Sequence, residues 1–588
     1  MKNILKSMEK NLTPEKAEML SHIFEPTAVA FPCTAAVANF TVLRDGEIRY
    51  YCNDLKKNHI DKGVRAYLST KDCGLTWEKH YQKDSSVIGN CIYVPEKDIY
   101  VKFANAAVDG HVKFPNDGNG IYVLISAVGP DDTAPAVYKV YDGKARIFRH
   151  VIYVESSGLL IATAEDVIGD TYHTVVFTSS DEGKTWDAQY LNPLPDYPVN
   201  YPDKGKRWQN HSCEPTIVQL TENELMIIFR TSYNYHYKYM SYDGGRTWNE
   251  PMPTDFHATL TMPTIKRMTD GDIIFTWCNT QPLPEFDHSK SMPPLSETEL
   301  RGRFEDCFTN RDANHIAVST DNAKTWQGFR EMALNPVRNS SDFRTVGGSV
   351  ESLDKSVHQF EIVELPMNKL MVAYGQHNCC ATIIVLDRNW IKEKYRYEDF
   401  SCGLENVSTH IFLKSNIGNY RGTYSGHCAL NRTHGAVMMP DPDMNSRDVL
   451  FISRIKDDRL LSEVQGAVWN FPAGRKGTLR FQMRNRGKGL AVSLTDRWFN
   501  PIDTYVREDA QISVNIDNSC IEDDKWIVIS ISWDCDKESY TVYADESKIC
   551  DGVIKGDCPN GICYVHFQSL AQEPDALGTY IGFIEKKE

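Results

Sequence analysis

The sequence predicts an all-β protein in two parts, and two observations carry this prediction. A short pattern, Ser-x-Asp-x-Gly-x-Thr-Trp with small drifts, recurs four times, at 69–77, 179–186, 241–248 and 319–326. Beyond about residue 400 the pattern stops, and segments such as 477–485 and 525–534 alternate apolar and polar residues as half-buried strands do. Repeated β units therefore come first, and a different β domain follows them.

The recurring pattern has the chemistry of a tight turn. An Asp side chain bonds back to nearby backbone amides, Gly permits a positive φ, and Trp supplies a large apolar anchor. The first copy carries an extra position before its Asp, and the last has Ala323 where the others have Gly. We therefore interpret the four motif carboxylates as structural turn residues: Asp72, Asp181, Asp243 and Asp321.

The pattern resembles the Asp box of sialidases and related β-propellers, where it forms the hairpin turn between the outer strands of a blade. The four box Asp residues lie 109, 62 and 78 residues apart. Because a blade takes roughly 40–60 residues, the longest gap can hold one blade without a box. A sixth blade is expected at 358–390, so the resemblance implies a six-bladed β-propeller over residues 27–395.

The segments that flank the propeller have their own character. The charged start, residues 1–26, is interpreted as a helical lead-in, either a short amphipathic helix or a frayed end. Residues 400–588 resemble a concanavalin-like or laminin-G-like β-sandwich, a lectin-like jelly roll. Such a module either binds sugar or buttresses the propeller.

Composition excludes several classes of function. The 588 residues include 64 Lys and Arg against 79 Asp and Glu, a net charge of −15, which disfavours nucleic acid and anionic membrane surfaces as partners. No apolar run approaches the length of a membrane helix or a secretory signal, so a cytoplasmic location is expected. The 16 cysteines form no Cys-x-x-Cys pair and are expected to be reduced thiols. GxSxG, GxxxxGK[ST] and HExxH motifs are absent, no metal or cofactor is required, and no feature sets the oligomeric state.

Counting from the hairpin turns puts charged residues at the channel. Nine residues before the turn residues Gly158 and Asn223 stand Arg149 and Glu214, and seven residues after them stand Glu165 and Arg230. The same count in the last blade gives Gln359. Ionised groups in a narrow channel are costly unless they are paired or meet a ligand, so these positions are candidate site residues.

The stretch 211–248 resembles the sialidase blade in which a functional Glu and a functional Arg flank one hairpin and an Asp box follows. The resemblance implies that Glu214 replaces the Glu that polarises the nucleophilic Tyr, and that Arg230 is one of three arginines that hold the substrate carboxylate. A guanidinium fork suits the planar carboxylate of a sialic acid. Arg149 and Arg311 are candidates for the other two arginines, because 31–47 has no Arg where the family's first Arg is expected. The family's acid Asp is sought at Asp61 or Asp54.

The family's nucleophilic Tyr has no counterpart in its expected register, because 357–361 contains no Tyr. Either a Tyr from elsewhere reaches the site, or a carboxylate or His activates water in an inverting hydrolysis. Glu214, Glu361 and His358 are the candidate bases, although His358 is equally expected as a packing residue.

The leading hypothesis is an exo-acting glycoside hydrolase that takes a terminal acidic sugar, a sialic acid or a related keto acid or uronate, from an oligosaccharide or glycoside. The alternative is a non-catalytic carbohydrate-binding propeller with a lectin-like accessory domain, which the missing Arg and Tyr favour. A third hypothesis, an Asp-box scaffold, accounts poorly for charges at the channel.

Overall fold

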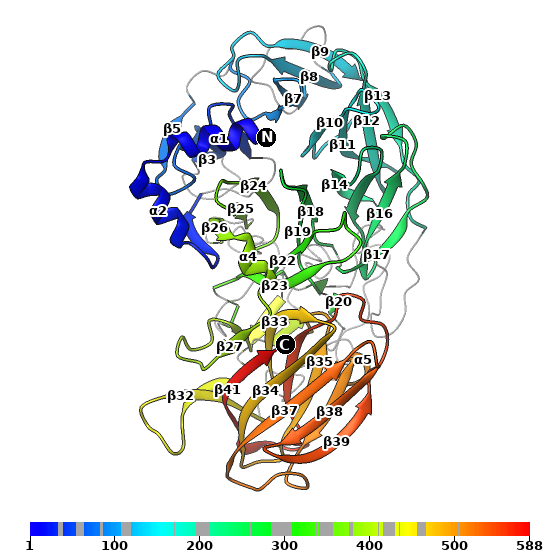
Figure 1. Ribbon diagram of the computed structural model, residues 1–588. Helices are drawn as coiled ribbons and strands as arrows, with labels where there is room; N and C mark the ends of the chain where they lie inside the picture. The colour runs from blue at the N-terminus through cyan, green and yellow to red at the C-terminus, as the bar shows by residue number, and fades with distance from the viewer. Residues whose placement is uncertain are drawn as a thin grey trace.

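The protein folds into a ring of β-sheets and an adjoining β-sandwich, as the computed structural model shows (Figure 1). The structure describes residues 1–32, 39–54, 64–82, 86–106, 119–169, 171–195, 212–258, 260–280, 282–283, 308–309, 311–336, 338–339, 357–375, 380–409, 411–414, 430–433, 435–454, 466–499, 501 and 506–588.

The ring consists of six four-stranded antiparallel sheets within the described chain, so the predicted six-bladed propeller is confirmed. Blades one to three contain β2 (Phe40–Val42), β3 (Ile48–Asp54), β4 (Val64–Thr70) and β5 (Glu78–Tyr81); β6 (Ile92–Val94), β7 (Ile99–Asn105), β8 (Ile121–Ser126) and β9 (Ala136–Tyr141); and β10 (Val151–Val154), β11 (Leu159–Ile168), β12 (Thr171–Ser179) and β13 (Asp187–Tyr190). Blades four to six contain β14 (Cys213–Gln219), β15 (Leu225–Arg230), β16 (Tyr235–Ser241) and β17 (Met252–His257); β18 (Thr264–Arg267), β19 (Ile273–Trp277), β22 (Ala313–Ser319) and β23 (Gln327–Leu334); and β24 (Phe360–Glu364), β25 (Lys369–Tyr374), β26 (Thr382–Asp387) and β1 (Thr27–Ala30). As predicted, blade two, which lies in the longest gap, has no Asp box.

The ring is closed by a strand from the other end of the propeller sequence. β1 precedes blade one in the chain, yet it pairs with β26 of blade six, with Thr27 opposite Val385 and Ala28 opposite Ile384. The first strands of successive blades contact each other around the centre, among them β2 with β6, β14 with β18 and β24 with β2. Backbone hydrogen bonds therefore fasten the segment that leads into blade one to the last blade, and the first strands face a shared channel.

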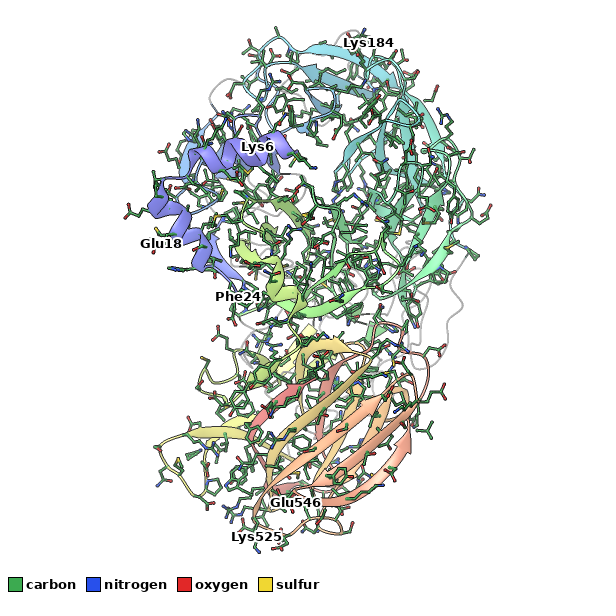
Figure 2. All side chains as sticks on the ribbon, viewed as in Figure 1. Lys6, Glu18, Phe24, Lys184, Lys525 and Glu546 are labelled. Atoms are coloured by element: carbon green, nitrogen blue, oxygen red, sulfur yellow. The ribbon has the colours of Figure 1, made fainter. Side chains whose placement is uncertain are left out.

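The Asp boxes form the turns between the third and fourth strands of their blades. In blade three, Asp181 accepts hydrogen bonds from the Thr185 N–H at 2.9 Å and the Thr185 hydroxyl at 2.7 Å, and from the Ser179 hydroxyl at 2.9 Å. The Thr185 N–H, with these hydroxyls, lowers the pKa of Asp181 to about 2. Lys184 of the same box is on the outer rim of the ring (Figure 2). The box carboxylates are turn residues far from the channel, as the sequence predicted.

Two helices precede the ring: α1 (Lys2–Asn11) and α2 (Pro14–His22). Ile4, Met8 and Leu20 are buried in a core that they share with blades one and six. Lys16 of α2 forms an ion pair of 2.7 Å with Asp72 of the first Asp box. The helices thus cover the part of the ring where it closes.

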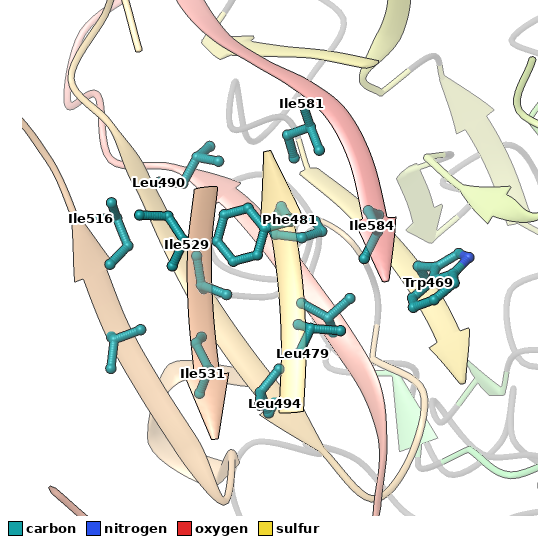
Figure 3. Packing of buried hydrophobic residues seen from close by; sticks show 14 of the residues in the cluster. Trp469, Leu479, Phe481, Leu490, Leu494, Ile516, Ile529, Ile531, Ile581 and Ile584 are labelled. Atoms are coloured by element: carbon teal, nitrogen blue, oxygen red, sulfur yellow. The ribbon is translucent and has the colours of Figure 1, made fainter. Parts of the chain in front are cut away.

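Beyond the ring, two packed sheets form the sandwich. The first sheet contains β31 (Val437–Pro440), β32 (Asp448–Arg454), β41 (Asp575–Lys587), β34 (Lys476–Asn485), β37 (Trp526–Asp534), β38 (Ser539–Ala544) and β39 (Ser547–Val553) in that order, with β27 (Arg396–Glu398) beside β41. The second contains β28 (Val407–Ser408), β33 (Gly466–Gly474), β40 (Ile562–Ser569), β35 (Leu490–Thr495) and β36 (Ile512–Ile516). Leu479 and Phe481 alternate along β34 with half-buried residues and meet Leu490 and Leu494 of the other sheet in the core (Figure 3).

The remaining elements are short: α4 (Arg388–Lys392), α5 (Val506–Asp509), and the strand pairs β20 (Pro282–Leu283) with β21 (Phe308–Thr309) and β29 (Ile411–Lys414) with β30 (Leu430–Thr433). β27 belongs to a sandwich sheet, so this sheet begins a few residues before the expected start at 400.

The sandwich packs on blade five through a buried hydrogen-bond network. The Asn470 side chain of β33 donates to the carbonyls of Phe329 and Cys563 at 3.0 and 3.1 Å, and its oxygen accepts the Glu331 N–H at 2.9 Å. Trp498 and Tyr564 of the sandwich share one apolar core with Phe275 and Trp277 of the ring. Because the core is continuous across the junction, the sandwich acts as a buttress of blade five.

Three kinds of feature are absent from the described residues. No described helix has the length and apolarity needed to cross a membrane. In the same part of the chain, no cluster of three or more His, Cys, Asp or Glu residues is arranged to hold a metal ion. The twelve cysteines that the structure describes are not joined as disulfides.

The Asp-box glycines give a test of the fold. Gly245 has a φ of +91°, and a Cβ there would lie 2.2 Å from Ile161 Cδ1 and 2.9 Å from Leu225 Cδ1, both in fully buried side chains. We expect Gly245→Ala to reduce the free energy of unfolding by about 1–3 kcal/mol in urea titrations, through backbone strain and overpacking. The control is Ala323→Gly, at the box position that already holds a left-handed Ala (φ 64), for which we expect a change below about 1 kcal/mol. Equal stability of Gly245→Ala and wild type would contradict this account.

Candidate active site

The centre of the candidate site is an ion pair at the start of blade four. Cys213 of β14 lies opposite Arg230 of β15, so the next residue, Glu214, reaches the Arg230 guanidinium, with Nη1 donating to Oε2 at 3.0 Å. The two side chains are 11% and 5% exposed. Burial alone raises the pKa of Glu214, but Arg230, with the charges of Arg311 and Arg149, lowers it below its ordinary value. Glu214 is therefore an ionised carboxylate held among arginines.

Glu165 stands behind this pair on β11. Its Oε2 accepts the Glu214 N–H at 2.6 Å and the Cys213 thiol at 2.9 Å, and its Oε1 accepts Arg146 Nε at 2.8 Å. Burial and the charge of Glu214 raise the pKa of Glu165, against the effect of Arg146. Glu165 thus fixes the backbone that presents Glu214, and its cationic partner is Arg146 rather than Arg149, the residue nearest to it in the predicted register.

Arg149 crosses the channel. Its Nη1 donates to the Pro263 carbonyl at 2.8 Å, and its Nη2 donates to the Thr264 hydroxyl and to the Phe360 carbonyl, the latter at 3.1 Å. Burial lowers the pKa of Arg149 to about 10, although Glu214, Glu361 and Glu165 oppose this change. The guanidinium ties blade three to blades five and six, and its positive charge also acts on Glu214.

Arg311 is fully buried just before β22 of blade five. Its Nη2 donates to the Leu260 carbonyl, and its own carbonyl accepts the Val357 N–H at 3.0 Å. It is among the positive charges that lower the pKa of Glu214. Three arginines from three blades, Arg149, Arg230 and Arg311, therefore act on one carboxylate.

Blade six contributes the remaining predicted residues. His358 is fully buried, and its carbonyl accepts the Gly375 N–H at 3.2 Å. Gln359 is 9% exposed and has a φ of +72°. The two oxygens of Glu361 accept the N–H groups of Asn39 and Phe40, both at 2.8 Å. Burial raises the pKa of Glu361, and these N–H groups act in the opposite direction. The two hydrogen bonds join blade six to the start of blade one.

Both oxygens of Glu361 accept backbone N–H groups, so Glu361 has a structural role that the sequence did not predict. The sequence predicted Glu361 as a candidate base. Asp61 lies outside the described residues, and so does the side chain of Asp54. The sequence reasoning missed Arg146, although Arg146 lies three residues before Arg149 in the same predicted strand start. It also missed Tyr172, whose hydroxyl accepts Arg146 Nη2 at 2.7 Å.

Backbone strain collects at this end of the channel. Non-glycine residues with positive φ stand at or just before the first strand in four blades: Ile147 (φ 60), Glu214 (φ 48), Leu260 (φ 50) and Gln359 (φ 72). A register shift between Cys213 and Thr216 bends β14 at the same level. Strain and bulges of this kind concentrate at functional sites, where they aim side chains in directions that a regular strand does not allow.

The N-terminal segment lies at the opposite end of the channel. Met1 and Lys2 line a cavity of ≈ 430 Å³ with Gln219 of β14 and Arg267 of β18, which are the last residues of their strands. Met1 also lines a smaller cavity of ≈ 130 Å³ with Arg149 and Glu361. Glu214 is near the start of β14, so the two features lie at opposite ends of that strand.

Comparison with known proteins agrees with this architecture. Residues 146–341 match the family described as the BNR repeat-like domain, which confirms the sialidase-like Asp-box resemblance. No curated protein matches the chain.

Solved structures similar to the chain include Trypanosoma rangeli sialidase, at 13% identity and a TM-score of 0.34, covering 95% of this chain and 92% of that one. The same sialidase in complex with sialic acid matches at 14% identity and a TM-score of 0.33, covering 94% and 91%. A protein of unknown function from Dyadobacter fermentans matches at 17% identity and a TM-score of 0.37, covering 62% of this chain and 99% of that one.

The central ion pair is testable by stability. Arg230→Met leaves the buried Glu214 carboxylate without its hydrogen-bonded cation, so we expect a loss of about 3 kcal/mol in the free energy of unfolding. The double variant with Glu214→Gln is expected to recover most of this loss, because neither charge of the Glu214–Arg230 pair then remains without the other. Arg246→Met, at an exposed Asp-box position, is the control and is expected to cost less than about 0.5 kcal/mol. A loss in the double variant as large as in the single one would contradict the pairing.

The raised pKa of Glu165 predicts that the stability of the protein depends on pH. A carboxyl group whose pKa is raised in the folded state binds its proton more tightly there, so its contribution to stability is full below the ordinary value of 4.5 and is lost as the pH rises through the folded value. Glu165→Gln removes this titration while it keeps an acceptor oxygen. We expect thermal melts between about pH 4 and 8 to show a smaller fall in Tm with rising pH for the variant than for wild type. Parallel curves would contradict the raised pKa.

Proposed function

We propose that the protein is an exo-acting glycoside hydrolase of the sialidase-like type, which releases a terminal acidic sugar. One observation carries the proposal: Glu214 is held ionised by Arg230, and the buried cations Arg311 and Arg149 act on the same carboxylate. In a protein of net charge −15, this group of arginines provides local positive charge where an anionic sugar would bind.

In this proposal Arg230 and Arg311 bind the sugar carboxylate, because guanidinium groups offer paired donors that match its two oxygens. Arg149 keeps its three bonds across the channel and supplies positive charge from beneath. Gln359 and the wall around Glu165 shape the pocket in this proposal. We expect the pocket to take a chain end, since Met1 and Lys2 line the far end of the channel.

The proposed chemistry begins at Glu214. Its lowered pKa keeps it ionised at neutral pH and therefore free of a proton, so it is the proposed base for activating water, with His358 as the second candidate. The acid that protonates the leaving oxygen is sought at Asp61. Attack by water would invert the anomeric configuration, unlike attack through a tyrosine.

The second candidate is a carbohydrate-binding propeller without hydrolysis. Two observations favour it: residues 357–361 contain no Tyr, and both Glu361 oxygens bond to backbone. In that case the arginines bind the acidic sugar and no bond is broken.

Chromogenic α-sialosides and uronides distinguish the two candidates. We expect turnover of one acidic glycoside and a loss of at least about 100-fold in kcat/KM for Glu214→Gln, which keeps size but removes the base. Glu222→Gln, at an exposed hairpin position of the same blade, is the control and should keep full activity. Proton NMR of the released sugar reports inversion or retention. No turnover, together with calorimetric binding of the free acidic sugar, would overturn the hydrolase and support the binding propeller.

A further inference from the structure

A pair of cysteines lies at the junction between ring and sandwich, far along the chain from the channel residues. Cys535 follows β37, Cys558 precedes β40, and their Sγ atoms are 3.0 Å apart. The two residues are 9% and 4% exposed. The distance between the two Sγ atoms is shorter than a van der Waals contact between sulfur atoms. A small movement of the two side chains would bring it to the length of a disulfide bond.

The pair lines a cavity of ≈ 750 Å³ between the two parts of the molecule. The ring contributes Tyr235, Asp255 and His257 to its wall, and the sandwich contributes Arg475 and Asn560. This volume is sufficient for a small disulfide compound to reach the sulfur atoms although little of either residue is exposed at the surface.

The surroundings make the two sulfurs unequal. The Cys558 thiol donates to Cys535 Sγ, and this hydrogen bond, with the charge of Arg475, lowers the pKa of Cys535. The same interaction and burial raise the pKa of Cys558. Arg475 Nη1 also donates to the Cys558 carbonyl at 3.1 Å, which holds the second cysteine in place. Cys535 therefore has the character of an attacking thiol and Cys558 that of a resolving thiol.

We propose that Cys535 and Cys558 form a redox modification site, which a small-molecule disulfide reaching the junction cavity oxidises to an intramolecular disulfide.

The reaction is a thiol–disulfide exchange in two steps. The Cys535 thiolate attacks one sulfur of R–S–S–R, the S–S bond breaks, and R–S⁻ leaves and takes a proton from water. Cys558 then loses its proton to water, and its sulfur attacks Cys535 Sγ in the mixed disulfide and expels the second R–S⁻, which takes up a proton from water. Two protein thiols are oxidised and one R–S–S–R is reduced to two R–SH.

The bond would stiffen the junction. It joins the β37–β38 turn to the loop that carries Asn560, whose Nδ2 donates to the Asp255 carbonyl of the ring at 3.0 Å. Fixing this loop removes conformations from the unfolded chain and holds one wall of the cavity. Oxidation would thus change the stability of the contact between the two parts.

Peptide mapping of the intact chain tests the proposal. The folded protein is incubated with oxidised glutathione, free thiols are blocked with iodoacetamide, and the digest is examined by mass spectrometry. We expect a peptide that links Cys535 to Cys558, and a Tm higher by roughly 5 °C that dithiothreitol reverses. In Cys558→Ser we expect the reaction to stop at a glutathione adduct on Cys535. Cys402→Ser, which alters an exposed thiol of the sandwich, should leave the link unchanged.

Two outcomes would overturn the proposal. One is carbamidomethylation of both Cys535 and Cys558 after oxidation while Cys402 carries glutathione, since the oxidant was then active. The other is a link that forms only after the protein is unfolded in urea. If Cys558→Ser fails to fold, the wild-type digest alone decides between these outcomes and the expected one.

Discussion

The pairing of β1 with β26 is the contact on which the site geometry depends. It joins residues 27–30 to 383–385 and turns a row of blades into a closed ring. Only in a closed ring do the starts of β10, β14, β18 and β24 face one channel. Arg149 then reaches carbonyls 114 and 211 residues further along the chain, and Glu361 caps backbone N–H groups more than 300 residues before it.

Closure of the ring also buries several carboxylates at the channel, and each of them has hydrogen-bond partners there. Glu165 and Glu214 are buried, Glu361 is half-buried, and all three act on the charge of Arg149. Their pKa values move in different directions: the pKa of Glu214 is lowered, while those of Glu165 and Glu361 are raised. Glu165 and Glu361 accept backbone N–H groups of neighbouring segments. Glu214 and Glu165 each accept a guanidinium N–H as well, from Arg230 and Arg146. The separation of pKa values leaves Glu214 ionised, while Glu165 and Glu361 bind a proton more readily.

The parts of this arrangement that could be predicted are those with a local cause. The Asp boxes were predictable because Asp181, Ser179 and Thr185 make their turn within seven residues of sequence. Glu214 and Arg230 were predictable because a hairpin of fixed length sets them across one strand pair. The partners of Arg149, by contrast, include the backbone carbonyls of Pro263 and Phe360. Every residue has such a carbonyl, so the sequence does not indicate which ones bind Arg149. Arg146 was missed because its isolated bridge to Glu165 lies outside the regular strands that were counted.

The same distinction bears on function. A buried ion pair adds little stability relative to apolar residues of similar size, and left-handed φ at Glu214 and Gln359 adds strain. Stability alone therefore gives no reason to keep Arg230, Arg311 and Glu214 together at the end of the channel opposite the N-terminal segment. A ligand whose charge the arginines complement gives such a reason, because its carboxylate would enter an already ordered set of donors without further reorganisation of the protein. The Asp boxes and the sandwich stabilise the ring, and the closed ring positions Glu214, Arg230 and Arg311.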